Sequence, residues 1–166
     1  MTDKPVLLVT GGSRGIGAAV CLLAAQKGWA VAVNYVSNQP AADAVAADIR
    51  AAGGEATAVR GDVGVAADID AMFVAVDRHF GRIDGLVNNA GVIDLSQRVD
   101  EMSAERLERM MRVNVIGSIL AAREAVRRMS TRHGGKGGAI VNISSMAAVI
   151  GSPSLYVDYA ASKAAI

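Results

Sequence analysis

The stretch Val6–Gly17 reads VLLVTGGSRGIG, a short apolar run followed by a glycine-rich turn. The unbroken apolar run Val6–Thr10 is typical of a strand covered on both faces, as in a parallel sheet. Apolar residues then recur at helical spacing and a glycine stop follows them: Ile16, Val20, Leu23, Ala24 and Gly28. The stretch predicts a strand, a tight turn and a helix, which begin a βαβ unit.

The same alternation continues along the chain. Further strands are expected at 30–35, 57–60, 85–89 and 139–144. Helices are expected between them, with apolar stripes at Ala42, Val45, Ile49 and Ala52, at Ile69, Met72, Phe73, Val76 and Phe80, and, in a long helix over 105–131, at Leu107, Met110, Met111, Val115 and Ala122. This order predicts an α/β fold, a doubly wound parallel sheet with helices on both faces, as one domain over 1–166.

Composition excludes several classes of function. The 166 residues carry a formal net charge of +1. The sequence therefore lacks the excess of basic residues expected of a protein that binds nucleic acid or an anionic membrane. The lone Cys21 cannot form an intrachain disulfide, and His79 and His133 stand apart from any cluster with ligand spacing, so no metal site is expected. The short apolar run near the start is no signal peptide or membrane span. We expect a soluble, cytoplasmic protein.

The glycine-rich turn has the chemistry of a phosphate site. Gly11, Gly15 and Gly17 lie between the first strand and the first helix, where glycine lets the backbone approach a pyrophosphate at the positive end of the helix dipole. No Lys-Ser or Lys-Thr pair follows, which disfavours a nucleotide-triphosphatase loop. Tight packing of strand against helix is the alternative interpretation of these glycines.

The end of the second strand bears on the choice of cofactor. Residues 34–38 read NYVSN and contain no carboxylate to accept the ribose 2′-hydroxyl of NAD. Arg14 is placed to pair with a 2′-phosphate, although a lone arginine can also simply lie on the surface. We therefore expect NADP, with NAD possible, and a carboxylate at Tyr35 is expected to shift the preference toward NADH.

Tyr159 and Lys163 are spaced i,i+4 in a segment whose alanines favour helix, so the phenol and the ammonium lie on one face. An unperturbed tyrosine has a pKa of about 10, and a neighbouring cation favours the phenolate. The pair could serve as an acid/base, or it could be an ordinary surface pair. Tyr156 has Ala160 at the corresponding position and carries no such partner.

Taken together, these motifs resemble the short-chain dehydrogenase/reductase family, and in particular bacterial oxidoreductases of the 3-oxoacyl-carrier-protein reductase and glucose 1-dehydrogenase type. They occur in the family's order along the whole chain: Thr10–Gly17, the NNAG sequence at 88–91, Asn114, the serines at 144–145, and Tyr159 with Lys163. The resemblance implies a Rossmann fold with three α/β/α layers. It also implies hydride transfer between a nicotinamide cofactor and a secondary alcohol or ketone.

The resemblance implies a role for each site residue. Tyr159 would be the acid/base, Lys163 would lower its pKa and bind the nicotinamide ribose, and Ser145 would hold the substrate oxygen, with Ser144 the alternative. Asn114 would interrupt its helix to hold a water of a proton relay, or be an ordinary polar break. Cofactor contacts are expected from Gly11, Ser13, Arg14, Gly15, Ile16, Gly17, Asn34, Asp62, Val63, Asn88, Ala90, Gly91, Tyr159 and Lys163.

Two other functions stay open on the residues alone. A non-catalytic dinucleotide-binding module that senses redox state would keep the glycine turn, and a methyltransferase would also explain it but would leave Tyr159 and Lys163 without a role. Members of the family usually continue well beyond the Tyr/Lys helix, whereas this chain ends at Ile166. We expect the sequence to be part of a longer protein that acts on a small carbonyl or alcohol substrate as a homotetramer or homodimer.

Overall fold

The structure, a computed structural model, describes residues 2–166. Its five strands pair in parallel in the order β3-β2-β1-β4-β5. The strands are β1 (Val6–Val9), β2 (Ala30–Tyr35), β3 (Glu55–Arg60), β4 (Gly85–Asn88) and β5 (Ala139–Asn142). The strand order reverses between β1 and β4, and in open α/β sheets ligands bind beyond the carboxyl ends of the strands at such a point.

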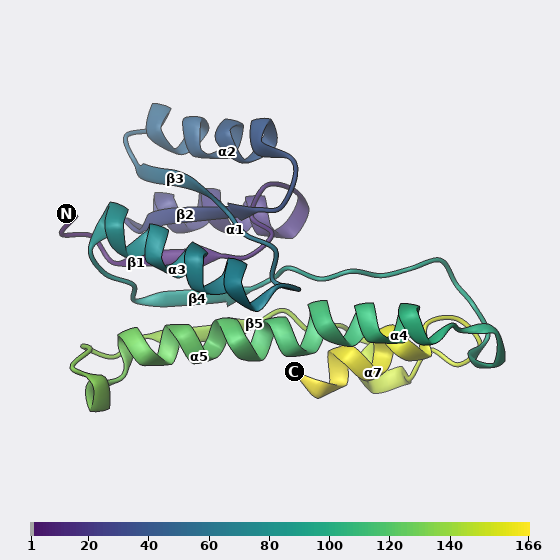
Figure 1. Cartoon of the computed structure of the whole chain (residues 1–166). Helices are drawn as coiled ribbons and strands as arrows, with labels where there is room; N and C mark the ends of the chain where they lie inside the picture. The colour runs from purple at the N-terminus through teal and green to yellow at the C-terminus, as the bar shows by residue number, and fades with distance from the viewer. Residues whose placement is uncertain (1) are drawn as a thin grey trace.

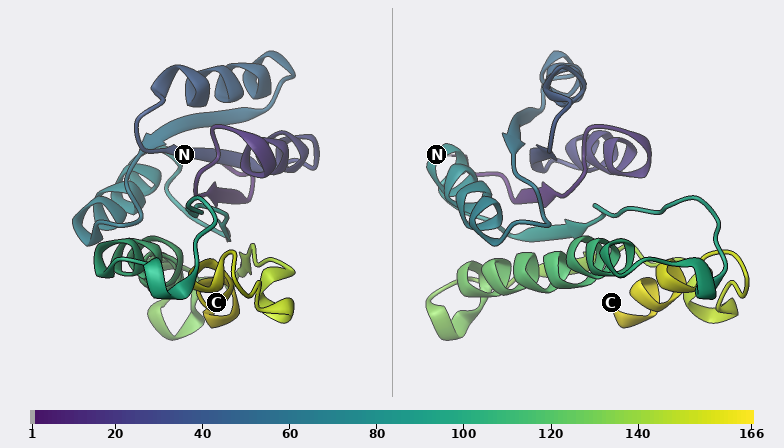
Figure 2. Two further views of the ribbon diagram at one scale, coloured as in Figure 1. Left: turned by 90° about the vertical axis from the view of Figure 1, so that its right-hand side faces the viewer. Right: turned by 45° about the vertical axis from the view of Figure 1, so that its right-hand side comes forward.

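Helices connect these strands (Figure 1). They are α1 (Gly15–Gln26), α2 (Gln39–Ala51), α3 (Ala66–Phe80), α4 (Ala104–Met111), α5 (Gly117–Met129), α6 (Ala147–Ile150) and α7 (Val157–Ala165), with the 3₁₀ turns η1 (Val99–Glu101) and η3 (Thr131–His133) and the π-helical turn η2 (Arg112–Ile116). Figures 1 and 2 show α4, η2 and α5 as one long rod, with α7 beside its α4 end.

The core lies on both faces of the sheet. Alternate β1 residues point in opposite directions: Val6 and Leu8 pack with α3 and α5, whereas Leu7 and Val9 pack with α1 and α2. The middle strands β1, β2 and β4 are buried along their whole length. The predicted doubly wound, three-layer α/β/α fold is confirmed.

Three of the predicted helical stripes are partly wrong, beginning with those of α1 and α2. On α1, Ile16 and Leu23 are 64% and 58% exposed, and the helix buries Gly17 and Cys21 instead. Small residues on this face let α1 lie close to the sheet, so the larger apolar residues were a misleading guide. Ala52, likewise expected to face inward, is exposed beyond the end of α2.

The predicted long helix over 105–131 is interrupted by η2. A π turn takes an extra residue, which shifts the buried face of the helix that follows it. Leu107 and Met111, on α4 before the π turn, are each 40% exposed, and Val115 in the turn and Ala122 after it are only half-buried. Met110 is buried as expected, and α5 turns inward a different set of residues, Ala121, Ala125 and Met129.

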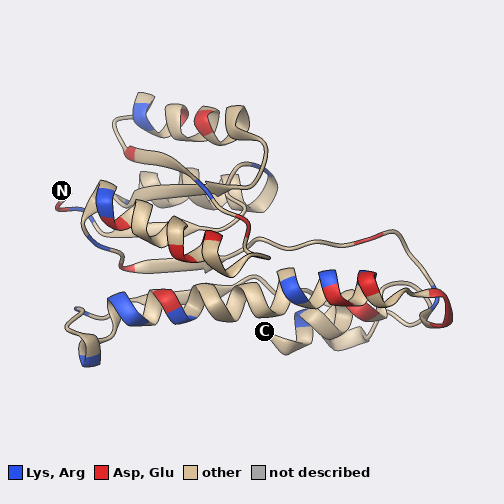
Figure 3. Ribbon diagram, in the orientation of Figure 1, with Lys and Arg blue, Asp and Glu red and all other residues tan. Residues whose placement is uncertain are grey.

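The fifth strand differs from the buried centre of the sheet. Within residues 2–166, β5 pairs with β4 alone and its residues are largely exposed. It ends at Asn142, two residues before the expected boundary, while β3 begins at Glu55, two residues before its expected start. Figure 3 shows Lys and Arg interspersed with Asp and Glu, mainly on the helices and the connecting segments.

Candidate active site

The glycine turn Gly11–Gly17 follows β1 and opens α1. Gly11 and Gly15 have φ angles of +62° and +54°, a left-handed conformation that favours glycine. A Cβ on Gly17 would lie 2.6 Å from Nδ2 of Asn89 and still closer to the carbonyl oxygen of Gly11. Because no side chain caps α1, its first N–H groups remain for a ligand.

Buried side chains hold this turn in place. The Asn34 Oδ1 accepts a hydrogen bond from Gly11 N at 3.0 Å, and its Nδ2 donates to the carbonyls of Val59 and Gly61 at 3.2 and 2.9 Å. Asn89 Nδ2 donates to the carbonyls of Thr10 and Gly11 at 2.9 and 3.1 Å. The turn is therefore preorganised by contacts to β2, β3 and β4.

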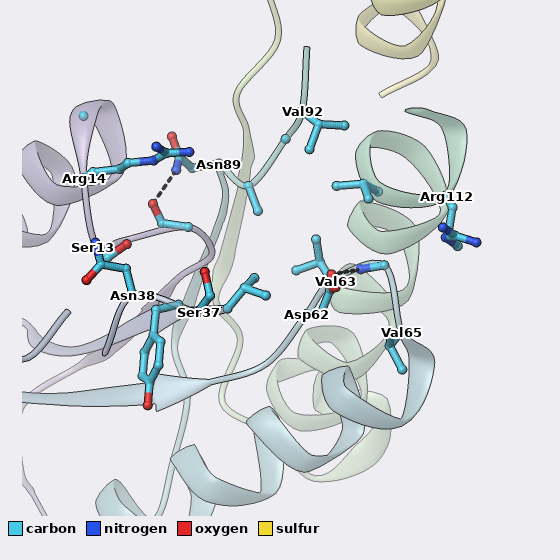
Figure 4. A pocket seen from close by; sticks show the side chains of 18 of the residues that line it. Ser13, Arg14, Ser37, Asn38, Asp62, Val63, Val65, Asn89, Val92 and Arg112 are labelled. Carbon is cyan, nitrogen blue, oxygen red and sulfur yellow. Dashed lines mark hydrogen bonds between the residues drawn. The ribbon is translucent and has the colours of Figure 1, made fainter. Parts of the chain in front are cut away.

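A cavity of about 1060 Å³ opens beside the turn (Figure 4). Nine of the predicted cofactor residues line it: Gly11, Ser13, Arg14, Gly15, Ile16, Asp62, Val63, Ala90 and Gly91. The lining also includes the end of β2 from Tyr35 to Asn38, the Asn89 and Val92 side chains, and Arg109, Arg112 and Val113 from the α4–η2 rod. The cavity lies where the strand order reverses.

Five predicted cofactor residues do not line this cavity: Tyr159 and Lys163 on α7, and Gly17, Asn34 and Asn88. Gly17 and Asn34 are buried, and Asn88 donates to the carbonyl of Ser118 and to Asn142 Oδ1, both at 3.0 Å. In this structure their hydrogen bonds and packing support the wall. The role proposed for them in direct cofactor contact stays a prediction.

The charges in the cavity wall differ in how they are held. Asp62 Oδ1 accepts a hydrogen bond from Gly64 N at 2.8 Å, which fixes the turn after β3. Arg109 forms an ion pair with Asp94, a residue of the segment that follows β4. Arg14 is exposed at the mouth of the glycine turn, and Arg112 is exposed on η2. Figure 4 shows Arg14 on the glycine-turn side of the cavity and Asp62 on the opposite side.

Tyr159 and Lys163 share one face of α7, as their spacing predicts. The Lys163 Nζ lies 5.8 Å from the centre of the Tyr159 ring and donates to the carbonyl of Ile143 at 2.7 Å. Lys163 is only 5% exposed. Burial disfavours its charged form and lowers the pKa of the Lys163 ammonium.

Asn114 occupies the centre of the π turn, so the helix is interrupted where the sequence analysis expected. Its Nδ2 donates to Ser162 Oγ on α7 at 3.0 Å, and its Oδ1 accepts from Val92 N at 2.8 Å. A Cβ on Gly91 would lie 3.3 Å from Asn114 Oδ1 and 3.5 Å from Lys163 Nζ. Asn114, Gly91 and Lys163 therefore converge at one point beside the cavity.

The two serines after β5 have different partners. Ser144 Oγ donates to the carbonyl of Lys163 at 2.7 Å, which fastens the end of α7. Ser145 Oγ accepts from Ala147 N at 3.2 Å and keeps its own proton for another acceptor. Of the two, Ser145 has the hydroxyl that can donate to a substrate oxygen.

Several residues of the site were missed by the sequence analysis. Thr10 Oγ1 accepts from the N–H groups of Asn89 and Ala90, both at 3.0 Å, and so joins the glycine turn to the NNAG segment. Gly12 N donates to the Asn34 carbonyl at 2.8 Å. Both residues lie in the quoted glycine motif, but nothing in the pattern indicates which neighbour each one binds.

The fold and the cavity define a dinucleotide-binding α/β protein, with the glycine turn at the switch in strand order. A family model described as short chain dehydrogenase matches residues 5–166, and the chain belongs to that family. The chain is 51% identical over 161 residues to an uncharacterized oxidoreductase of Escherichia coli, YgfF, and 41% identical over 161 residues to the 3-oxoacyl-[acyl-carrier-protein] reductase of a Synechocystis strain. Each match covers 97% of this chain.

Solved structures agree with this assignment. A short-chain dehydrogenase/reductase from Serratia marcescens superposes with a TM-score of 0.90 at 38% identity over 97% of this chain. The chain spans 65% of the E. coli relative, 63% of the Synechocystis enzyme and 63% of the Serratia chain. In residues 2–166 there is no helix long and apolar enough to cross a membrane and no His, Cys, Asp and Glu grouping suited to a metal ion.

Proposed function

We propose that the protein is an NADP(H)-dependent oxidoreductase that interconverts a secondary alcohol and a ketone, with Tyr159 as the acid/base. The observation that carries this proposal is the buried Lys163 ammonium, which lies next to the Tyr159 ring and beside Gly91, a residue that lines the cavity. A non-catalytic dinucleotide-binding module would have no use for a buried cation at this place, where its desolvation is costly.

The residues present fit a dinucleotide. Gly15 has open space around the position of a Cβ, and the uncapped start of α1 offers N–H groups to a pyrophosphate. Arg14 and the exposed Ser37 could bind a 2′-phosphate, and residues 35–38 bring no carboxylate that would repel it. When bound, the nicotinamide supplies or accepts the hydride. These features favour NADP, with NAD as the alternative.

The proton chemistry falls to this chain's own side chains. In the direction of reduction, the Tyr159 hydroxyl donates a proton to the substrate oxygen, and the Lys163 cation stabilises the phenolate that remains. The Ser145 hydroxyl donates a hydrogen bond to the same oxygen, where negative charge develops. Asn114 joins the π turn to α7 and so sets the position of this group of residues. The proposed substrate is a small carbonyl or alcohol, and the proposed setting is a cytoplasmic homo-oligomer.

The test is turnover of NADPH by the full-length protein with a panel of ketones, sugars and acyl thioesters. Tyr159→Phe is expected to reduce turnover by about 10²–10⁴-fold, because it removes the proton donor but keeps the ring. NADPH affinity should stay near that of the wild type. Tyr156→Phe is the matched control and should keep its turnover.

Two outcomes would contradict the proposal. Turnover in Tyr159→Phe close to the wild-type rate would remove Tyr159 from the chemistry. Tight NADPH binding with no turnover on any member of the panel would favour the non-catalytic module.

A further inference from the structure

Arg106 on α4 forms the most buried ion pair of those in residues 2–166. Its Nε and Nη2 donate to Oδ2 and Oδ1 of Asp158 at 2.7 and 3.3 Å, and the two side chains are 11% and 1% exposed. The remaining Nη1 donates to the carbonyl of Leu95 at 2.8 Å and to Gln97 Oε1 at 3.0 Å. One guanidinium thus joins α4, the segment 92–98 and the first turn of α7.

The partner carboxylate stands directly before Tyr159. Asp158 is the second residue of α7, so its placement fixes how that helix begins. The approach to α7 has little intrinsic preference for this path, since Ser152 and Ser154 have positive φ angles of 44° and 62°. A backbone hydrogen bond from Gln97 N to the Leu155 carbonyl, 2.9 Å long, makes a second link to the segment 92–98.

The charges around the start of α7 are nearly balanced. Burial alone would raise the pKa of the Asp158 carboxyl, but the hydrogen bonds and charge of Arg106, with the backbone N–H of Tyr159, hold it below its usual value. The other titratable groups around α7 are Asp94 and Arg98 in the segment 92–98, Glu105, Glu108 and Arg109 on α4, Arg112 on η2, and Tyr156, Tyr159 and Lys163 at or on α7; α6 carries no charge. Asp94 is paired with Arg109.

We propose that Arg106 is a positioning residue for Tyr159: it holds Asp158 at the start of α7, ties that helix to the segment 92–98, and cancels the carboxylate charge that precedes the phenol. The Lys163 cation then acts on Tyr159 without an opposing charge from Asp158. This inference rests on the proposed function only in taking Tyr159 as the acid/base.

The experiment is a titration of the Tyr159 phenol in the full-length protein, measured as the ultraviolet difference between each variant and the same variant carrying Tyr159→Phe. Arg106→Gln leaves Asp158 unbalanced and should raise the pKa of Tyr159 by about half a unit or more. Asp158→Asn keeps the shape of the side chain but leaves the positive charge of Arg106 without a counter-charge, so it should lower the pKa of Tyr159. The double variant Arg106→Gln/Asp158→Asn should return it to the wild-type value.

A purely structural pair would not produce opposite shifts that cancel in the double variant. Arg98→Gln is the matched control, because it breaks the exposed ion pair of Arg98 with Asp100 and should leave the phenol unchanged. If Arg106→Gln fails to fold, the downward shift in Asp158→Asn decides the question. An unchanged Tyr159 pKa in folded Asp158→Asn would overturn the proposal. Equal shifts of that pKa in Asp158→Asn and Arg98→Gln would overturn it as well.

Kinetics add a second measurement. Arg106→Lys keeps the charge but lacks the two-pronged geometry, so kcat should fall about tenfold while NADPH affinity stays unchanged. The titration needs no substrate. Loss of the expected shifts therefore counts against the role of Arg106, whereas normal shifts with no turnover on any ketone count against the proposed function.

Discussion

Asn114 pairs with the backbone of Val92 as a neighbouring strand would: its Oδ1 accepts from Val92 N at 2.8 Å and its Nδ2 donates to Val92 O at 2.9 Å. The π turn brings the amide to this place, because the extra residue in the turn rotates Asn114 toward the end of the NNAG segment. One buried amide thereby connects the cavity wall, the long helical rod and, through Ser162, α7.

Asn114→Ala is expected to lower the free energy of unfolding by about 2–3 kcal/mol, since it removes a buried amide and leaves the half-buried backbone groups of Val92 without these partners. Urea denaturation measures the change. Asn38→Ala is the control, because Asn38 is an exposed cap of α2 and its loss should cost about 1 kcal/mol. Equal losses in the two variants would contradict the structural role given to Asn114.

Gly17→Ala tests the close contact between α1 and the glycine turn. The added Cβ would meet backbone and the Asn89 amide, which are not free to move, so we expect at least about 2 kcal/mol of destabilisation and much weaker NADPH binding. Gly28→Ala is the control: it introduces a strained φ, but its Cβ would lie in open space away from the cavity. It should cost about 1 kcal/mol and leave NADPH binding intact.

Cofactor preference should respond to Arg14 and to the exposed residues that follow β2. Arg14→Ala is expected to narrow the ratio of NADPH to NADH affinity, measured by titration of the full-length protein. The sequence favours Tyr35 as the position for a competing carboxylate, but Tyr35 is 8% exposed and packs in the core. Val36 is 48% exposed and lines the cavity, so Val36→Asp is the better test.

Val36→Asp should repel the 2′-phosphate, offer an acceptor to the ribose of NADH, and shift the preference toward NADH. Val65→Asp is a useful control, as Val65 is similarly exposed at 45% but lies on the other wall of the cavity. Equal wild-type affinities for the two cofactors would refute the preference for NADP.

The buried Lys163 predicts a dependence of stability on pH. Its folded-state pKa is lowered by burial, so between that value and the unfolded value of about 10.5 the unfolded chain binds more protons. Wild-type stability should therefore gain a contribution as pH rises through this window. Lys163→Met should remove that gain, whereas the exposed Lys136→Met should keep it. Parallel stability curves for wild type and Lys163→Met would contradict this prediction.

The thiol of Cys21 should report on unfolding. Cys21 is fully buried against Gly12, and burial raises the pKa of its thiol to about 12. Ellman's reagent at pH 8 should leave the native protein unmodified and react fully in urea, because the thiolate is the reactive form. Rapid reaction of the native protein would show that α1 opens from the sheet.

How well the sequence predicts the buried face of a helix depends on the size of the residues that form that face. The large apolar residues of α3 repeat at helical spacing, and all five predicted positions are buried. On α1 the fully buried positions are the small Gly17 and Cys21, and hydropathy misplaced Ile16 and Leu23, whereas Val20 and Ala24 of the predicted stripe pack against the core. Arg106 and Asp158 lie 52 positions apart and share no motif, so only the folded chain brings them together.

Asn34 and the residues that follow β2 differ in how far they are expected to tolerate substitution. The Asn34 side chain secures the glycine turn to β3 from a fully enclosed position, while the four residues after Tyr35 are exposed. If the proposed cofactor binding holds, mutations in that exposed tract are expected to alter which ribose is recognised without disturbing the scaffold. A lineage carrying this arrangement is then expected to exchange one nicotinamide cofactor for the other in single substitutions, each intermediate remaining folded while Asn34 is retained.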